Sequence, residues 1–270
     1  MDTVSGLGRL DRERLALVLR GTTGTISVED TSKILSIPAN TAGKMLSRWR
    51  KNGWLSRVRR GLYVPVPLES QTADVPLEDP WIVADRLFSP CYIGGWSAAE
   101  HWGLTEQIFR TIVVMTTRTP RDQSPKLKGT SFLLRTILKK ALFGLKPVWR
   151  GRVKVSVSDP TRTVLDMLHT PRLGGGIRST VDILISYLKS DSKNTSQLLE
   201  YAERLDNGAV YKRLGFLLER FVSEETELIG ECHCRLTKGN AKVDPSLSAD
   251  RLVTKWRLWV PEHWVTGTPK

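Results

Sequence analysis

The chain has 270 residues, of which 40% are hydrophobic and 26% charged; this is the balance of a folded globular protein and excludes a largely disordered one. No stretch approaches the roughly 20 consecutive apolar residues that a bilayer crossing needs, and the first residues lack the basic start and apolar run of an export signal. We therefore expect an intracellular, cytoplasmic protein without membrane contact. The three cysteines, an odd number in a large chain, argue against a disulfide framework.

Positive charge is the most informative part of the composition. Lysine and arginine number 41 against 28 acidic residues, a net charge of +13, which predicts attraction to phosphate polyanions. Residues 40–64 carry seven basic side chains and no acidic one. A second run, residues 110–154, carries twelve basic side chains against one acidic residue, Asp122. We expect two separate basic surfaces, one in each half of the chain.

Apolar spacing predicts a first helix over residues 10–20. Leu15, Val18 and Leu19 fall on one face of it at i, i+3 and i+4. This face should pack on the elements that follow.

A short second helix is predicted to begin after Ser27 and to run to about Leu35. Ser27 is a good N-cap, and Asp30 stands three residues later, as in a capping box. Pro38 ends the segment, because the residue before a proline is pushed out of helical geometry, and is itself acceptable in the first turn of a new helix.

The third predicted helix covers residues 38–52. Ala42, Leu46 and Trp49 lie on its inner side at helical spacing. The opposite side is polar and basic and carries Thr41, Lys44, Arg48 and Lys51. This pattern is typical of a recognition helix, whose first turns enter the DNA major groove while later basic residues contact phosphates.

A hairpin is predicted directly after this helix. Residues 54–58 and 62–64 are short runs of β-forming residues, joined by an Arg-Arg-Gly turn at 59–61. Three helices followed by a basic hairpin is the winged helix-turn-helix arrangement, and arginines at the wing tip suit phosphates or a narrow minor groove.

The residues predicted to contact DNA are Asn40, Thr41, Lys44, Arg48, Lys51, Arg57, Arg59 and Arg60. The first three would approach base edges and the other five the backbone or the minor groove. Two alternatives remain: the basic helix face is only solvated, or the winged helix docks another protein.

Several segments together resemble the AbiEi-type antitoxins of bacterial abortive-infection, or type IV toxin–antitoxin, loci. The first is RVRRGLYV at 57–64, followed by YIGGWSAAEHWGLT at 92–105 and VSDPTRTVLD at 157–166. Fainter likenesses are the glycines at 174–176 and KWRL at 255–258. The resemblance covers most of the chain in order.

The resemblance implies an N-terminal winged helix that represses its own operon at an operator with inverted repeats. It also implies a C-terminal domain that counters a nucleotidyltransferase-like toxin without holding it in a stable complex. In this interpretation the protein is a repressor and antitoxin rather than an enzyme, and it needs no cofactor or metal. The predicted division is a winged-helix domain at 1–66, a linker at 67–80 and a C-terminal domain at 81–270.

The expected fold class is α+β, an N-terminal winged helix-turn-helix followed by a larger mixed α/β domain. In the second domain, helices are predicted over residues 81–88, 97–102, 159–168, 177–189, 195–205 and 210–224. Strands are predicted over residues 112–115, 131–134, 153–157 and 256–260. The glycines at 174–176 are interpreted as a turn between two helices.

Two patterns raise the question of other chemistry. Gly95-Trp96-Ser97-Ala98-Ala99 imitates a nucleophile elbow, with Asp159 or Asp166 and then His169 or His233 as partners; the simpler interpretation is that Ser97 caps a helix. Cys232-His233-Cys234 suggests zinc, but its spacing is too tight and a second ligand pair is missing, so these are interpreted as ordinary strand residues. Arg162 and Asp166, four apart on a predicted helix, suggest a weak salt bridge that belongs to the scaffold.

The basic run at 110–154 permits two hypotheses: it lengthens the DNA footprint, or it contacts RNA. The rival from another class is a winged-helix-targeted nuclease or other phosphoryl-transfer enzyme, which would need paired carboxylates for a divalent ion. A regulator without a toxin partner is the remaining alternative.

Overall fold

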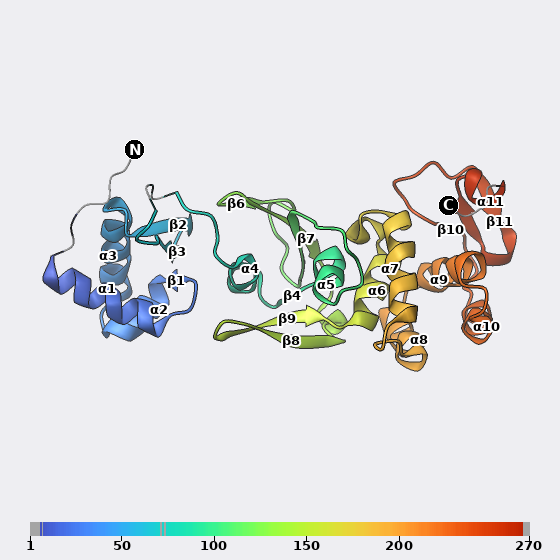
Figure 1. Ribbon diagram of the computed structural model, residues 1–270, viewed down its shortest axis with the longest axis horizontal. Coiled ribbons are helices and arrows are strands. Elements are labelled where there is room, and N and C mark those ends of the chain that lie inside the picture. Colours follow the sequence, from blue (N-terminus) through green and yellow to red (C-terminus); the bar gives the residue numbers. More distant parts are fainter. Residues whose placement is uncertain (1–5, 7, 71, 73, 267–270) are drawn as a thin grey trace.

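The computed structural model describes residues 6, 8–70, 72 and 74–266. Figure 1 shows an elongated arrangement that follows chain order, with a helical and hairpin part at one end, a central sheet, and helices with a small sheet at the other end. The fold class is α+β, a winged helix-turn-helix followed by a larger mixed α/β part, as predicted. Among the described residues, no helix is long and apolar enough to cross a membrane.

The N-terminal part confirms the predicted three helices and hairpin. It consists of α1 (Arg9–Gly21), β1 (Ile26–Ser27), α2 (Val28–Leu35), α3 (Ala39–Lys51), β2 (Leu55–Arg59) and β3 (Leu62–Pro65). The predicted capping box is present, since the Ser27 side chain accepts from the Asp30 amide and the Asp30 carboxylate accepts from the Ser27 amide. The sequence did not indicate β1, which pairs with β3 and makes the wing a three-stranded sheet in the order β1-β3-β2.

A small apolar core holds the three helices and the wing together. Val18, Leu46 and Trp49 are fully buried in it. Leu19 was expected in this core but is 39% exposed, so that prediction is wrong. Only Leu15 and Val18 of α1 are buried, so the face of α1 that packs on the core is narrower than the apolar face predicted from the sequence, and Leu19 lies outside it.

A six-stranded mixed sheet forms the middle of the molecule. Its strands are β4 (Cys91–Ile93), β5 (Thr111–Thr116), β6 (Lys126–Leu127), β7 (Thr130–Thr136), β8 (Leu145–Arg150) and β9 (Val153–Ser158), in the order β6-β7-β5-β4-β9-β8. The pairs β5–β7 and β4–β9 are parallel and the others antiparallel. Ile93 and Val114 pack with α4 (Pro80–Phe88), while Tyr92 and Val113 face the other way and pack with Leu173.

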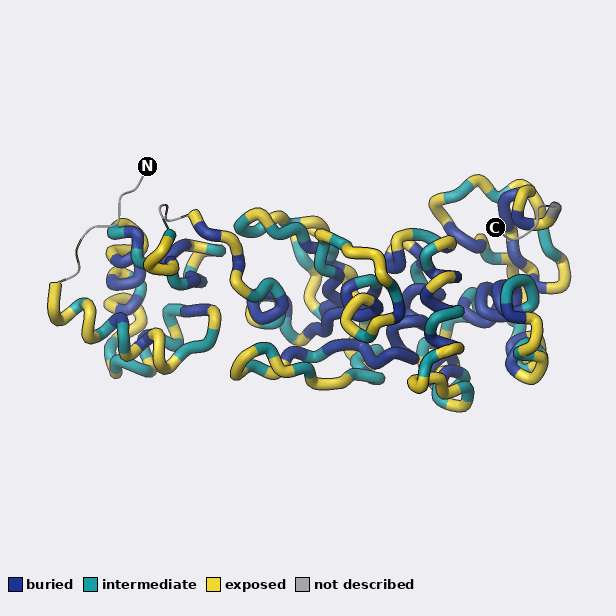
Figure 2. The backbone as a smooth tube through the Cα atoms, in the orientation of Figure 1, coloured by how far each residue is buried: buried dark blue, intermediate teal, exposed yellow. Residues whose placement is uncertain are grey.

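The largest core lies among the helices that follow the sheet. These helices are α6 (Pro160–His169), η2 (Pro171–Gly174), α7 (Ile177–Lys189), α8 (Thr195–Leu205), α9 (Gly208–Phe221) and α10 (Thr226–Cys234). Helix α6 is central, since its residues 160–168 are all buried (Figure 2). Arg213 of α9 is buried and donates to the carbonyls of Leu168 and His169 at the end of α6. The last backbone carbonyls of a helix have no hydrogen-bond partner within the helix, and Arg213 supplies one for these two.

A small sheet closes the described chain. It consists of β10 (Ala241–Lys242), β11 (Arg251–Val253) and β12 (Leu258–Val260), with η3 (Thr254–Trp256) before β12 and α11 (His263–Thr266) after it. The predicted late strand is thus confirmed from Leu258 onward, while Trp256 lies in the preceding 3-10 helix.

Two local predictions in this half are wrong. Ser97 does not cap α5 (Gly95–His101), whose N-cap is Gly94; its hydroxyl instead accepts from the amide of Val113 at 3.0 Å. Cys232-His233-Cys234 lies on α10, not on a strand, because the preceding residues continue a helix that packs on α9. The glycine turn is confirmed: Gly175 and Gly176 have φ of 82° and 105° between η2 and α7.

The segment between the wing and α4 is not a free spacer. Its described residues form no helix or strand, yet Val75 and Leu77 are buried in the same apolar cluster as α4. Val64 of β3 and the adjacent Val66 join that cluster too. The wing strand therefore leads directly into the core of the central sheet, and the division of the chain at 66 and 80 stays a prediction.

Candidate nucleic-acid interface

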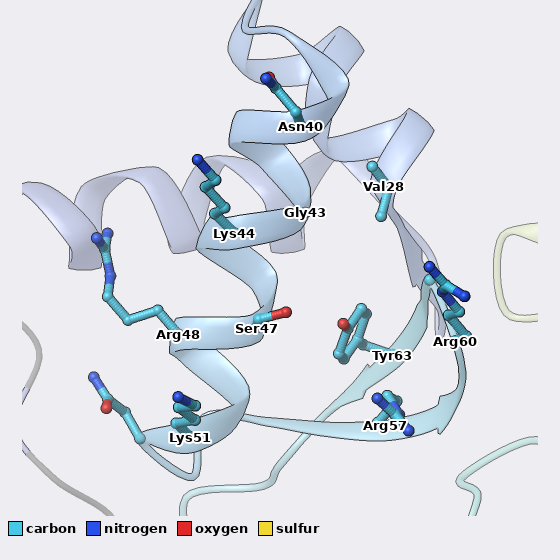
Figure 3. A pocket seen from close by; sticks show the side chains of 12 residues that line it. Val28, Asn40, Gly43, Lys44, Ser47, Arg48, Lys51, Arg57, Arg60 and Tyr63 are labelled. Carbon is cyan, nitrogen blue, oxygen red and sulfur yellow. The ribbon is translucent and has the colours of Figure 1, made fainter.

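A groove of about 680 Å³ runs between α3 and the wing. Figure 3 shows Asn40, Lys44 and Arg48 on successive turns of α3, with Arg57 and Arg60 on the wing across from the helix. The fold puts them there because the inner side of α3 is fixed by buried Leu46 and Trp49. The polar side must then face outward, beside the hairpin.

Six of the eight predicted DNA-contacting residues line this groove: Asn40, Lys44, Arg48, Lys51, Arg57 and Arg60. Thr41 and Arg59 are exposed but lie outside its lining. For Arg59 the cause is local, since a register shift separates it from Arg57 and breaks the alternation of the strand. Whether any of the eight contacts DNA stays a prediction.

The groove also includes residues that sequence reasoning passed over. Gly43 and Tyr63 line it, and a Cβ built on Gly43 would meet no atom within 4 Å. Tyr63 comes from β3 and forms the wall between α3 and Arg57 (Figure 3). Helical spacing from Asn40 could have indicated Gly43, whereas the position of Tyr63 depends on how the wing packs against α3.

The positive charge at the groove is partly offset by an acidic residue from outside residues 40–64. Asp11, from α1, forms an ion pair with Arg48 at 2.6 Å, with the side chain of Asp11 23% exposed. The sequence around α3 could not have indicated Asp11, because Asp11 lies 37 residues before Arg48. Asn40 is also engaged: its side-chain oxygen accepts from the Thr41 amide, which leaves its amide group to donate outward.

The second basic run does not form one continuous surface. Lys126 lies on β6, at one edge of the six-stranded sheet, whereas Lys146 and Arg150 lie on β8, at the other edge. Arg150 forms an ion pair with Asp79 and Lys128 one with Asp74. The expectation of a single basic surface from residues 110–154 is therefore wrong, because the sheet separates its members.

The motif at 157–166 forms a buried polar network. The side chains of Arg162 and Asp166 are 1% and 3% exposed, and Nε of Arg162 lies 2.9 Å from Oδ1 of Asp166. The hydroxyl of Tyr92 donates to Asp166 and accepts from Arg162. Burial raises the pKa of Tyr92 far above its ordinary value, so the phenol stays protonated. Asp159 caps α6 by accepting from the Arg162 amide.

The residues considered for other chemistry have structural partners. Ser97 is buried and bonded to the backbone of β5. Burial raises the pKa of Cys232 to about 12, which keeps it a thiol near neutral pH. In the described part of the chain, no three His, Cys, Asp or Glu side chains are grouped as a metal site would need.

The geometry defines a winged helix-turn-helix with a basic groove. Residues 13–66, which are 54 of the 270, match the family model described as "Transcriptional regulator, AbiEi antitoxin". This match confirms the predicted similarity to the AbiEi-type antitoxins over residues 13–66, which comprise most of α1 together with α2, α3 and the wing. The likeness of the segments at 92–105, 157–166, 174–176 and 255–258 stays a prediction. No curated protein matches the chain significantly.

Proposed function

We propose that the protein is a DNA-binding transcriptional repressor that binds its own operator and acts as the antitoxin of an abortive-infection toxin–antitoxin pair. The groove between α3 and the wing carries this proposal, because Lys44, Lys51 and Arg57 converge on it from two elements. A recognition helix beside a basic wing suits the major groove and its flanking phosphates. The family description of residues 13–66 supports the same role.

In this proposal Asn40, Thr41 and Lys44 approach base edges, and Arg48, Lys51, Arg57, Arg59 and Arg60 meet phosphates or the minor groove. The operator contains inverted repeats, so two copies of the winged helix read two half-sites. The domains are the winged helix at 1–66, the connecting segment at 67–80 and the antitoxin part at 81–270. Contact of residues 110–154 with RNA stays a prediction.

Operator binding is tested by fluorescence anisotropy on DNA from upstream of the gene, over a series of salt concentrations. The double variant Arg57→Ala/Arg60→Ala should bind more weakly, and its slope of log affinity against log salt should fall by about 1.8, or ~0.9 for each phosphate that it no longer neutralises. Arg12→Ala/Arg20→Ala removes the same charge from exposed positions of α1, outside the groove, and should leave the slope near the parent value. Equal weakening in both variants would contradict the assignment of the groove.

The toxin pairing is tested separately. Expression of the adjacent open reading frame should arrest growth, and co-expression of this protein should restore it. Growth that is unaffected by the neighbouring gene would leave a transcriptional regulator without a toxin partner.

A further inference from the structure

A second cavity, of about 200 Å³, lies between the end of β7, the short helix η1 (Lys139–Ala141) and the helices α6 and α8. It belongs to the central and C-terminal parts and shares no lining residue with the groove of the winged helix. Its volume lies below the roughly 300–1,000 Å³ of typical ligand pockets, so it suits a small ligand that stays partly exposed to solvent, rather than a duplex or a folded partner.

Three cationic side chains from three different elements line this cavity: Arg135 of β7, Lys140 of η1 and Arg204 of α8. Neither Arg135 nor Lys140 forms an ion pair with any described residue. Arg204 pairs with Glu200 at 3.7 Å and lies over the Phe143 ring, 3.8 Å from its centroid. The cavity therefore concentrates positive charge that the protein does not fully neutralise.

The floor of the cavity is preorganised. Arg162 and Asp166 line it, and their charges compensate each other within the buried network with Tyr92. The guanidinium of Arg162 has five N–H hydrogens, and its acceptors among the described residues are Asp166, Tyr92 and the Phe143 carbonyl. Each of its three nitrogens therefore has an acceptor, so this side chain, which is 1% exposed, is held in one position beside the cavity.

The remaining lining is apolar and neutral. Met115, Ile137 and Leu205 form the apolar wall. Burial lowers the pKa of His169, so its ring is neutral near pH 7 and adds a polar but uncharged group. An apolar wall beside a cationic rim suits a flat apolar group joined to a compact anion.

We propose that this cavity binds a small phosphate-bearing molecule of the mononucleotide class, with Arg135, Lys140 and Arg204 holding the phosphate and the Arg162–Asp166–Tyr92 network fixing the floor. A phosphate carries a charge of about −1.5 to −2 at neutral pH and three acceptor oxygens, which matches a rim of three cations better than a single carboxylate does. The base or another flat group lies against the apolar wall. The motif at 157–166 thereby contributes to a ligand site and not only to the scaffold.

The test is isothermal titration calorimetry of the full chain with each of the four ribonucleoside 5′-monophosphates, with adenosine and with citrate. At least one monophosphate should bind saturably at one site, with a Kd below about 1 mM. Adenosine and citrate should bind at least tenfold more weakly than that monophosphate, since each lacks one half of the recognised chemistry. Absence of saturable binding by all four monophosphates, or equal binding of citrate, overturns the proposal.

The site is located with a matched pair of variants. Arg135→Ala/Lys140→Ala removes two exposed rim cations and should weaken binding roughly 100-fold, about tenfold for each charge-assisted hydrogen bond removed. Arg121→Ala/Lys126→Ala removes the same charge from exposed positions outside the cavity and should bind like the parent. Equal weakening in both would show that only net charge matters and would overturn the site.

Operator affinity measured on the same two variants separates this inference from the proposed repressor function. Arg135→Ala/Lys140→Ala should bind the operator like the parent, because neither residue lies near the groove of the winged helix. Loss of both nucleotide binding and operator binding would show that the variant is misfolded. In that case the variant Arg135→Lys/Lys140→Arg, which keeps both charges, should bind the nucleotide. Its failure to bind overturns the proposal.

Discussion

Arg48 differs from the other cations of the groove because an acid from another helix holds it. The ion pair with Asp11 orients the guanidinium and offsets part of its charge. Both side chains remain partly exposed, so the pair contributes little to the stability of the fold. Its main consequence is electrostatic, since it reduces the positive charge that the recognition helix presents.

Asp11→Asn should therefore increase DNA affinity. Without the carboxylate, Arg48 no longer gives up an ion pair when it meets DNA, and a repulsive charge is removed, so we expect a gain of roughly two- to fivefold. The salt slope should steepen by up to about 0.9, the value for one fully neutralised phosphate, because Asp11 no longer offsets the charge of Arg48. Anisotropy titrations over a series of salt concentrations measure both quantities.

Glu13→Gln is the matched control, because it makes the same charge change on the same helix while Glu13 pairs with exposed Arg9 outside the groove. It should leave affinity and slope close to the parent values. If it produced the same gain as Asp11→Asn, the total charge and not the Arg48 pair would govern binding.

Arg162 and Asp166 illustrate what residue spacing does and does not reveal. Their i,i+4 spacing predicted the ion pair, which the structure confirms at 2.9 Å. The sequence predicted a weak pair, because exposed i,i+4 pairs contribute only about a few tenths of a kcal/mol. This pair is buried instead. Burial depends on the sheet residue Tyr92 and on Phe143, which lie far away in the sequence. A buried pair is costly to break from one side, because the remaining charge has no partner.

Helix α9 packs closely through a glycine against η3, the short helix beside the small C-terminal sheet. A Cβ built on Gly215 would lie 2.0 Å from an atom of the Trp256 ring. That ring is fully buried and donates through Nε1 to Glu219 on the same helix, so it has little room to move away. A glycine is thus required at position 215 because the Trp256 ring lies so close to the α9 backbone, and not because the residue has a positive φ.

Gly215→Ala should destabilise the protein, although alanine is intrinsically the better helix former by about 1 kcal/mol. The methyl group overpacks the contact with Trp256, and overpacking of this kind typically costs about 1–3 kcal/mol. The urea midpoint of unfolding should fall accordingly.

Gly230→Ala, in the interior of α10, is the control for this substitution because nothing lies within 4 Å of its Cβ position. It should leave the midpoint unchanged or raise it. A gain in both variants would mean that the Trp256 contact yields to the methyl group.

Helices with strong periodicity were predictable, and so were the strands β2, β3, β5, β7 and β9, whereas the shortest strands and β8 were not. α2, α7 and α8 have the predicted bounds, and α1 and α3 differ from theirs by one residue at each end. The three-residue strand β4 is too short for a recognisable alternation. In β8, Lys146 and Pro147 suit an edge strand, which is defined only by its pairing with β9. The same limit applies to the groove. The residues that α3 contributes to it could be predicted from helical spacing, whereas the positions of Asp11 and Tyr63 depend on tertiary packing.

At the scale of the whole molecule, the winged helix is tied to the rest of the chain by polar as well as apolar contacts. Arg86 of α4 donates to the Asp30 carboxylate at 2.5 Å and to the Ser27 hydroxyl at 3.1 Å. These two residues form the capping box of α2, so one arginine connects the start of the helix-turn-helix to the central sheet. Val64 and Val66 connect the wing to the same region.

Acid should weaken this connection. Burial raises the pKa of Asp30, but the hydrogen bonds from Ser27 and Arg86 outweigh it and hold the pKa below its ordinary value of 3.8. The folded chain therefore binds fewer protons than the unfolded chain in acid. The contribution of Asp30 to stability is complete above the unfolded-state pKa and is lost as the pH falls through the lower folded-state pKa.

Arg86→Ala should reduce this acid dependence. Without the arginine, the pKa of Asp30 moves back towards its ordinary value, and stability at pH 7 falls by about 0.5–1 kcal/mol, the range for a partly exposed pair. Urea midpoints measured from pH 7 to pH 3 should thus converge for variant and parent as the pH falls. Arg20→Ala, which removes an exposed cation from α1, should run parallel to the parent over the whole range. If Arg86→Ala also ran parallel to the parent, Asp30 would owe its low pKa to the capping box alone, and α4 would hold the winged helix through apolar contacts only.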